Sequence, residues 1–264
     1  MNFEGVLTKM ESEFSEPIQY YLVFETDFLN INQLLEKTIT LQFIKYQCLN
    51  CGLDKPIYRQ GFCKSCFFDI PQAADWVLRP ELSTAHLDKE DRDLEYEKKV
   101  QLQPHIVYLA NSSNVKVGVT RKSQIPTRWI DQGAVEAVLL AETPYRQAAG
   151  LIEVSLKKHI ADKTNWRNML KNEFTNSMGI LEMKKNLVSL IPDDLKQFIS
   201  DKNEVTKINF PVIQYPQKLT SLNLDKVPVI EKKLMGIKGQ YLIFDDNTVI
   251  NLRSHTAYKV TLEA

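Results

Sequence analysis

The sequence has no apolar run that approaches the roughly 20 residues needed for a membrane-spanning helix. Its start, Met1 to Glu4, lacks the basic residues and the apolar stretch of a signal peptide. We therefore expect a cytoplasmic protein without a membrane partner. The sequence also has no phosphate-binding glycine-rich loop, no Ser-His-Asp pattern and no carboxylate pair typical of glycosidases. Nothing in it thus favours a P-loop enzyme, a serine hydrolase or a glycosidase.

An excess of charge of one sign is also missing, because 33 Lys and Arg residues balance 33 Asp and Glu residues. A chain of zero net charge does not attract nucleic acid through its overall field, so any such role needs local patches. One basic stretch, residues 116–128, contains no acid, and a second, mainly basic one follows at 157–171. Residues 88–97 instead hold six acids. Charge runs are often only solvated faces, so these stretches alone do not establish a nucleic-acid surface.

Cysteine is absent from the chain outside one short segment, residues 48–66. Two CxxC pairs separated by eleven residues lie there, formed by Cys48, Cys51, Cys63 and Cys66. Four thiolates at this spacing can surround a Zn²⁺ ion tetrahedrally, at about 2.3 Å. Redox motifs and disulfides are the alternatives, but disulfides are rare in the cytoplasm and a redox CxxC normally stands alone. The segment therefore predicts a zinc ribbon with a structural ion, because four protein ligands leave no open position for catalysis.

Strand-like runs occur near both ends of the chain. They lie at residues 18–24, 39–46, 241–244, 249–252 and 257–262. The turn-forming residues Asp245 to Thr248 join two of these runs into a hairpin. We expect a small β-barrel or sandwich at the C-terminal end, completed by the N-terminal strands.

The middle of the chain alternates strands and helices. Hydrophobic patterning predicts strands at residues 106–110, 115–120 and 137–141. Turn residues join the first two, which should form a hairpin. Pro126 can begin a short helix, and Thr143 with Pro144 supplies the N-terminal cap of a longer helix reaching about residue 161. The order of elements is therefore β-β-α-β-α.

An apolar stripe supports the longer helix. Its members recur every three or four residues, at Tyr145, Ala149, Ile152, Leu156 and Ile160. Glu153 lies off this stripe, on a face shared with Arg146 and Gly150. Gly150 costs roughly 1 kcal/mol relative to alanine inside a helix, so it suggests the close approach of another backbone or of a substrate. Two short amphipathic helices are expected further on, at 180–190 and 193–199.

This order of elements and its motifs resemble the GIY-YIG nuclease superfamily. Residues 106–108 (IVY) resemble the first name motif and residues 116–118 (KVG) the second, with isoleucine replacing the first glycine and lysine replacing the second tyrosine. Ten residues beyond the second motif, Arg128 matches the family's helix arginine. Glu153 matches the metal-binding glutamate, and Asn165 follows it at a spacing similar to that in the incision subunit of bacterial nucleotide excision repair.

The resemblance implies hydrolysis of phosphodiester bonds in DNA or RNA, with one divalent metal. Mg²⁺ or Mn²⁺ would be held by Glu153. Tyr108 would deprotonate or orient the attacking water, with Lys116 lowering its pKa. Arg128 would neutralise charge on the transferred phosphate. Asn165 would belong to the catalytic site, or else cap the helix that follows it.

The resemblance also makes nucleic acid the expected partner, contacted through Arg121, Lys122 and Lys157. Together with the cysteine spacing and the strand-like runs, it predicts an α+β protein built from six consecutive parts. These are an N-terminal β region (1–47), the zinc ribbon (48–72), a linker or helix (73–103), the GIY-YIG-like domain (104–170), a helical connector (171–205) and a C-terminal β domain (206–264).

The whole chain also resembles a bacterial family known as a domain of unknown function. The shared segments are the ribbon, HIVYLA at 105–110, KVGVTR at 116–121, RWIDQGA at 128–134 and GIKGQYL at 236–242. That resemblance implies no activity. Two other functions stay open: a non-catalytic nucleic-acid-binding module, and a zinc-stabilised scaffold that binds another protein. The sequence does not indicate an oligomeric state.

Overall fold

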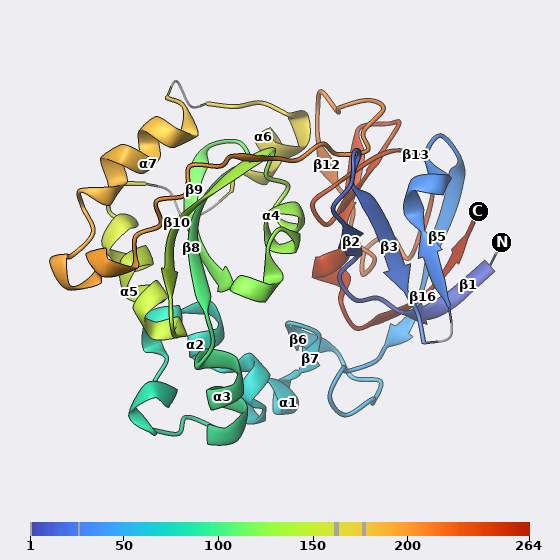
Figure 1. Ribbon diagram of the computed structural model, residues 1–264. Helices are drawn as coiled ribbons and strands as arrows, with labels where there is room; N and C mark the ends of the chain where they lie inside the picture. The colour runs from blue at the N-terminus through green and yellow to red at the C-terminus, as the bar shows by residue number, and fades with distance from the viewer. Residues whose placement is uncertain (1, 26, 161–163, 176–177) are drawn as a thin grey trace. The chain divides into compact units, whose positions relative to one another are not determined.

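The computed structural model describes residues 2–25, 27–160, 164–175 and 178–264, and it is a mixed α+β protein (Figure 1). The chain forms two compact units. The terminal unit comprises Met1–Phe68 and Ile208–Ala264, and the central unit comprises Asp69–Lys207. Within the described ranges, no helix is long and apolar enough to cross a membrane.

The terminal unit contains a seven-stranded sheet with strand β5 (Thr38–Tyr46) near its middle. Strand β5 pairs antiparallel with β16 (Tyr258–Glu263) on one side and with β13 (Val229–Lys238) on the other. The remaining strands are β1 (Asn2–Val6), β14 (Tyr241–Phe244), β15 (Thr248–Asn251) and β12 (Thr220–Ser221), in the order β1-β16-β5-β13-β14-β15-β12. The prediction that N-terminal strands complete the C-terminal sheet is thus confirmed, as is the hairpin of β14 and β15.

This sheet is open rather than a closed barrel. Closure needs the two edge strands to hydrogen-bond to each other. In the described part of the chain, β1 pairs with β16 alone and β12 pairs with β15 alone, so the sheet keeps two edges. A separate antiparallel sheet holds β2 (Glu11–Glu13), β3 (Gln19–Val23) and β4 (Phe28–Asn30).

The central unit is built on a four-stranded antiparallel sheet in the order β11-β10-β8-β9. Strands β8 (His105–Asn111) and β9 (Val115–Arg121) form the predicted hairpin, and β10 (Glu136–Thr143) is the predicted third strand. The short β11 (Thr206–Lys207) completes the sheet beside β10. Strand β9 is an edge strand, which leaves one side of it available to other groups.

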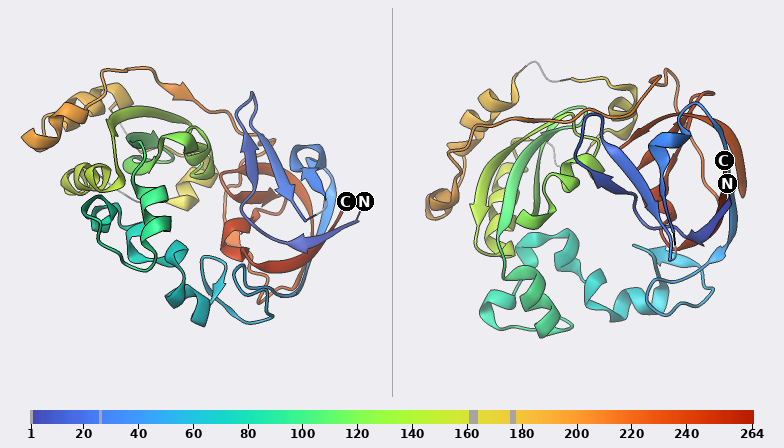
Figure 2. Two further views of the ribbon diagram at one scale, coloured as in Figure 1. Left: turned by 60° about the horizontal axis from the view of Figure 1, so that its bottom comes forward. Right: turned by 45° about the vertical axis from the view of Figure 1, so that its right-hand side comes forward.

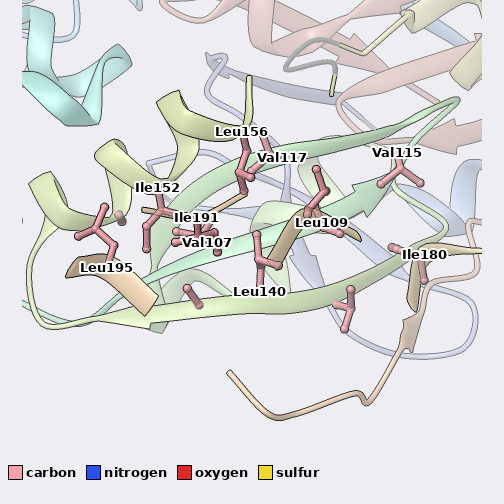
Figure 3. Close-up of a cluster of buried hydrophobic side chains, with 14 residues drawn as sticks. Val107, Leu109, Val115, Val117, Leu140, Ile152, Leu156, Ile180, Ile191 and Leu195 are labelled. Atoms are coloured by element: carbon pink, nitrogen blue, oxygen red, sulfur yellow. The ribbon is translucent and has the colours of Figure 1, made fainter. Parts of the chain in front are cut away.

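Helices α5 (Arg146–Leu156) and α7 (Ile180–Val188) cover one face of this sheet (Figures 1 and 2). Buried Val, Leu and Ile side chains from three strands, from these helices and from the segment that follows α7 form the core (Figure 3). Figure 3 labels Val107, Leu109, Val115, Val117, Leu140, Ile152, Leu156, Ile180, Ile191 and Leu195. Each such side chain contributes about 1.5–3 kcal/mol when fully buried, so this core fixes α5 against the sheet.

Helix α5 begins later than the sequence predicted. Thr143 is the last residue of β10, and its hydroxyl donates to the carbonyl oxygen of Tyr145 at 3.0 Å instead of capping the helix. Tyr145 is the N-cap residue, and the helix ends at Leu156. It therefore stops short of the predicted end near residue 161, a position that itself lies outside the described residues. Ala149, Ile152 and Leu156 are buried, as their stripe predicted.

The remaining helical elements are short. The α-helices are α1 (Lys64–Asp69), α2 (Asp75–Leu78), α3 (Leu94–Gln101), α4 (Thr127–Asp131) and α6 (Trp166–Lys171). Single 3₁₀ turns are found at 31–34, 71–73, 80–82, 85–87, 122–124, 193–198 and 252–255. The helix expected at 193–199 is thus a 3₁₀ segment, whereas α4 follows Pro126 as predicted.

Another backbone approaches α5 closely at Gly150. An added Cβ there would lie 2.2 Å from the amide nitrogen of Glu81 and 2.5 Å from the carbonyl carbon of Pro80. We expect Gly150→Ala to lower the unfolding free energy by about 1–3 kcal/mol, because backbone atoms cannot move aside cheaply. Urea unfolding measures this change.

Gly179→Ala is the matched control for this prediction. In the described residues nothing lies within 4 Å of a Cβ at Gly179, which is the N-cap of α7. Its effect should stay within about 1 kcal/mol, the size of a weakened cap. Equal effects of the two substitutions would mean that the backbone contact at Gly150 does not stabilise the unit.

Candidate active site and metal centre

Four residues that the sequence selected lie around one pocket of the central unit. The pocket has a volume of about 130 Å³. Its lining comprises Val77, Leu78, Pro80, Tyr108, Lys116, Val117, Gly118, Val119, Arg128, Gln132, Arg146 and Glu153. Side chains alternate between the two faces of a strand, and consecutive residues 116–119 all line the pocket. The pocket therefore wraps around the free edge of β9.

The β8–β9 register explains the glycine of the second motif. Tyr108 and Gly118 are direct cross-strand partners, as are Ala110 and Lys116. A Cβ on Gly118 would lie 2.6 Å from the hydroxyl oxygen of Tyr108. Only glycine therefore leaves room for the tyrosine ring to cross β9 and bring its hydroxyl to the pocket.

The Tyr108 hydroxyl is buried and held in place. Gln132 donates from Nε2 to its oxygen at 2.6 Å, and the ring packs edge-on to Trp129, with centroids 6.0 Å apart. Burial raises the pKa of Tyr108, although the Arg128 guanidinium and the Gln132 amide act to lower it. The phenol is therefore neutral near pH 7. Arg128 is a nearby cation that acts on it, and Lys116 donates from Nζ to the Thr164 hydroxyl at 2.5 Å.

Glu153 is a buried carboxylate on α5, facing the pocket. Burial raises its pKa, and the charge and hydrogen bond of Lys157 oppose that shift. The Nζ atom of Lys157 lies 3.3 Å from Oε2 of Glu153, one helical turn away. Lys157, predicted to contact nucleic acid, thus pairs with Glu153. A bound dication would favour the ionised carboxylate more strongly still.

Arg146 is a pocket residue that the sequence analysis did not select. Its Nε and Nη2 donate to the carbonyl oxygens of Trp76 and Val77, at 3.2 and 2.8 Å. Burial lowers its pKa to about 10, with Glu153 opposing the shift, so it stays charged at neutral pH. Arg146 precedes Glu153 by seven residues, or two helical turns, and this spacing alone places both on one face.

Gln132 was also missed, although it follows Arg128 by four residues at the end of α4. The charged side chains of the lining are three cations, Lys116, Arg128 and Arg146, and one carboxylate, Glu153, among the described residues. A pocket of this charge favours an anion.

Besides Lys157, three predicted residues lie away from the pocket lining. The Asn165 side chain accepts from the amide nitrogens of Arg167 and Asn168, at 3.2 and 3.3 Å, and so caps α6. Lys122 pairs with Glu142, with 2.5 Å between Nζ and Oε1. Arg121 ends β9. Their predicted contacts with nucleic acid or substrate stay predictions.

The four cysteines meet in the terminal unit, after β5. Their sulfur atoms all lie within 4.8 Å of one another, and Cys51 and Cys63 are 4.0 Å apart. A tetrahedral zinc site with bonds of about 2.3 Å separates its sulfurs by roughly 3.8 Å. The cluster is therefore close enough to bind a metal ion such as zinc.

The surroundings of the sulfurs suit thiolates. Burial alone would raise the pKa of Cys48, but backbone amides of Cys51, Cys63 and Asn50 outweigh it and lower the value to about 6. One of these bonds joins the Cys63 nitrogen to the Cys48 sulfur at 3.3 Å. The Asn50 amide likewise donates to Cys66 at 3.3 Å. Burial and the neighbouring sulfurs nevertheless raise the pKa of Cys66 to about 11, a shift that a bound cation would reverse.

The comparison with protein families matches residues 36–260 to the family described as "Protein of unknown function (DUF2797)". The chain belongs to this family. The DUF2797 match covers the four cysteines and every residue of the pocket lining, so both sites lie within it. No curated protein and no solved structure matched the chain.

Proposed function

We propose that this DUF2797 protein hydrolyses phosphodiester bonds in DNA or RNA, as a nuclease of the GIY-YIG type. The supporting observation is that Tyr108, Lys116, Arg128 and Glu153, from four different elements, line one pocket. The order β8-β9-α4-β10-α5 also agrees with the order of elements in that superfamily.

Glu153 is the proposed ligand of a Mg²⁺ or Mn²⁺ ion. A single carboxylate suffices, because Mg²⁺ keeps several waters and takes phosphate oxygens as further ligands. When bound, the ion would polarise the phosphate and stabilise the charge that develops on it. Glu153 fits this role because it is the one acid among the described lining residues and its burial disfavours an uncompensated charge.

The other side chains would bind and orient the phosphodiester. Arg128 and Arg146 can donate paired hydrogen bonds to phosphate oxygens, and Lys116 adds a third positive charge. Tyr108 keeps its proton near neutral pH because burial raises its pKa. We therefore assign to its hydroxyl the orientation of the attacking water, rather than the removal of a proton from it.

For the cysteine cluster we propose a structural Zn²⁺ ion. All four sulfurs would be ligands, so no coordination position is left for substrate.

The test is cleavage of a panel of labelled DNA and RNA, single and double stranded, with Mg²⁺, with Mn²⁺ and without a divalent ion. The proposal expects cleavage that requires the ion. Salt-sensitive binding without cleavage under any condition would favour the non-catalytic binding module instead. The absence of both would favour the protein-binding scaffold.

Tyr108→Phe is expected to lower kcat about 100-fold, because it removes the one hydroxyl that orients water while leaving the ring in place. Substrate affinity should change little, since the cations that bind phosphate are untouched. Tyr96→Phe on α3 is the control and should leave kcat unchanged. Full activity of Tyr108→Phe would remove the tyrosine from the mechanism.

A further inference from the structure

Three aromatic side chains gather on the surface of the zinc-ribbon segment. Tyr58 contacts Phe67 and Phe68, with ring centroids 5.2 and 5.7 Å apart, and Phe67 lies 5.3 Å from Phe68. Tyr58 is 43% exposed and Phe68 58% exposed. We call these three residues the aromatic cluster.

The aromatic cluster is not the core of the ribbon. That core consists of buried Cys48, Cys63 and Cys66, with Ile57 and Phe62 packed against them. Ile57 and Tyr58 are neighbours on strand β6 (Ile57–Arg59), whose pairing with β7 (Phe62–Cys63) shifts register between Ile57 and Arg59. Ile57 packs against the cysteines, whereas the Tyr58 ring contacts Phe67 and Phe68. Burying the cluster is not needed to hold the cysteines together.

Positive charge accompanies the exposed rings. The guanidinium carbon of Arg59 lies 5.3 Å from the centre of the Tyr58 ring. Lys55 and Lys64 are exposed in the same segment, and the acids beside the cluster are the exposed Asp54 and Asp69. Exposed aromatic rings with adjoining cations bind single-stranded nucleic acid, since each base offers a π-face and each nucleotide a phosphate. A duplex hides its base faces and fits this surface poorly.

We propose that the aromatic cluster is a stacking platform for the bases of single-stranded nucleic acid. Tyr58 and Phe68 would stack on bases, and Arg59 with Lys55 and Lys64 would contact the phosphates. This binding site lies in a different unit from the pocket and needs no catalysis, so it goes beyond the proposed function.

The experiment measures binding of a short fluorescein-labelled oligothymidine to the full, zinc-loaded chain by fluorescence anisotropy, without Mg²⁺ and with Glu153→Gln in every sample to prevent cleavage. Tyr58→Leu and Phe68→Leu keep apolar volume but remove the aromatic face. Each is expected to weaken binding about 10-fold, the usual loss for one stacked base. Phe28→Ala is the matched control, because Phe28 is 70% exposed in the same unit but lies in another sheet.

A second arm replaces the oligonucleotide with an abasic strand of the same length, which keeps the phosphates and removes the bases. The proposal expects the abasic strand to bind the parent chain about 100-fold more weakly, because it loses the stacks on both Tyr58 and Phe68, and to be insensitive to Tyr58→Leu. Equal affinity for the two strands would overturn the proposal in favour of phosphate contacts alone. The same conclusion would follow if Arg59→Ala weakened binding and Tyr58→Leu did not. Self-association that Phe68→Leu abolishes would overturn it in favour of a protein interface.

Failure here is distinguishable from failure of the proposed nuclease. Hydrolysis of bis(p-nitrophenyl) phosphate requires no base stacking, so Tyr58→Leu in the otherwise unchanged chain should leave its rate unaltered. Bound zinc, measured for each variant, shows whether the ribbon remains folded.

Discussion

Glu153→Gln is expected to lower Mg²⁺-dependent cleavage by at least about 100-fold, because it removes the negative charge proposed to hold the ion while keeping the size of the side chain. Stabilisation of transition-state charge by a metal ion is worth several kcal/mol, which corresponds to this factor or more. The measurement is single-turnover cleavage of the best substrate in the panel. The affinity for Mg²⁺, followed by titration, should fall in parallel.

Glu182→Gln is the control for this variant, since Glu182 is an exposed acid on α7 in the same unit. It should cleave at the rate of the unchanged chain. Cleavage that survives in Glu153→Gln would show that the ion, if there is one, is held elsewhere. Loss of cleavage in both variants would indicate a general effect on folding.

The same carboxylate predicts a pH dependence. Burial raises the pKa of Glu153, and the metal requires its ionised form. As pH falls, Mg²⁺ affinity should therefore decrease at a pH where an exposed glutamate would still be ionised. Mg²⁺ titrations at a series of pH values check this, and Glu153→Gln should lose that acidic limb. If Mg²⁺ affinity falls only in the pH range where an exposed glutamate becomes protonated, burial does not control the ionisation of Glu153.

Cys48→Ser is expected to remove the bound metal and to unfold residues 48–66 locally. Structural zinc contributes about 10–16 kcal/mol of apparent binding free energy in zinc-finger peptides, so the loss of one thiolate should lower the affinity by orders of magnitude. The ribbon has little apolar core besides the cysteines themselves, with Ile57 and Phe62 packed on them. It should not stay folded without the ion.

Zinc content by mass spectrometry and amide hydrogen exchange across residues 48–66 measure both effects. The Cys63 amide, which donates to the Cys48 sulfur, should exchange much faster in the variant. Ser65→Ala is the control, because Ser65 is exposed between the last two cysteines. The seven-stranded sheet, with its own buried side chains, should remain protected. A chain that purifies without metal and keeps its ribbon would contradict the structural role.

Local patterns in the sequence predicted most elements near the candidate sites. The two CxxC pairs predicted that the four cysteines lie together, because all four belong to one short segment. Apolar runs predicted β8 and β10, alternation predicted β9, and Pro126 predicted the start of α4. The stripe through Ala149 predicted which face of α5 is buried. Each of these follows from neighbours in sequence, where spacing and geometry correspond directly.

The end of β10 and the start of α5 were predicted less well. Thr143 and Pro144 look like a cap, yet Thr143 remains in the strand as the cross-strand partner of His105. A pairing of residues about 40 positions apart outweighed a local preference, which is a common outcome because propensities are weak beside tertiary contacts.

Only the tertiary structure decided what the pocket contains. The wall formed by residues 77–81 comes from a segment that carries no motif, and its backbone both accepts from Arg146 and packs on Gly150. Tyr108 turned out to depend on Gly118 for space and on Gln132 for orientation. The sequence by itself determined the residues that can do chemistry and the elements that carry them. Long-range packing decided the environment of these residues. Burial and hydrogen bonding depend on partners that are far apart in the sequence, and no local spacing predicts which of them meet.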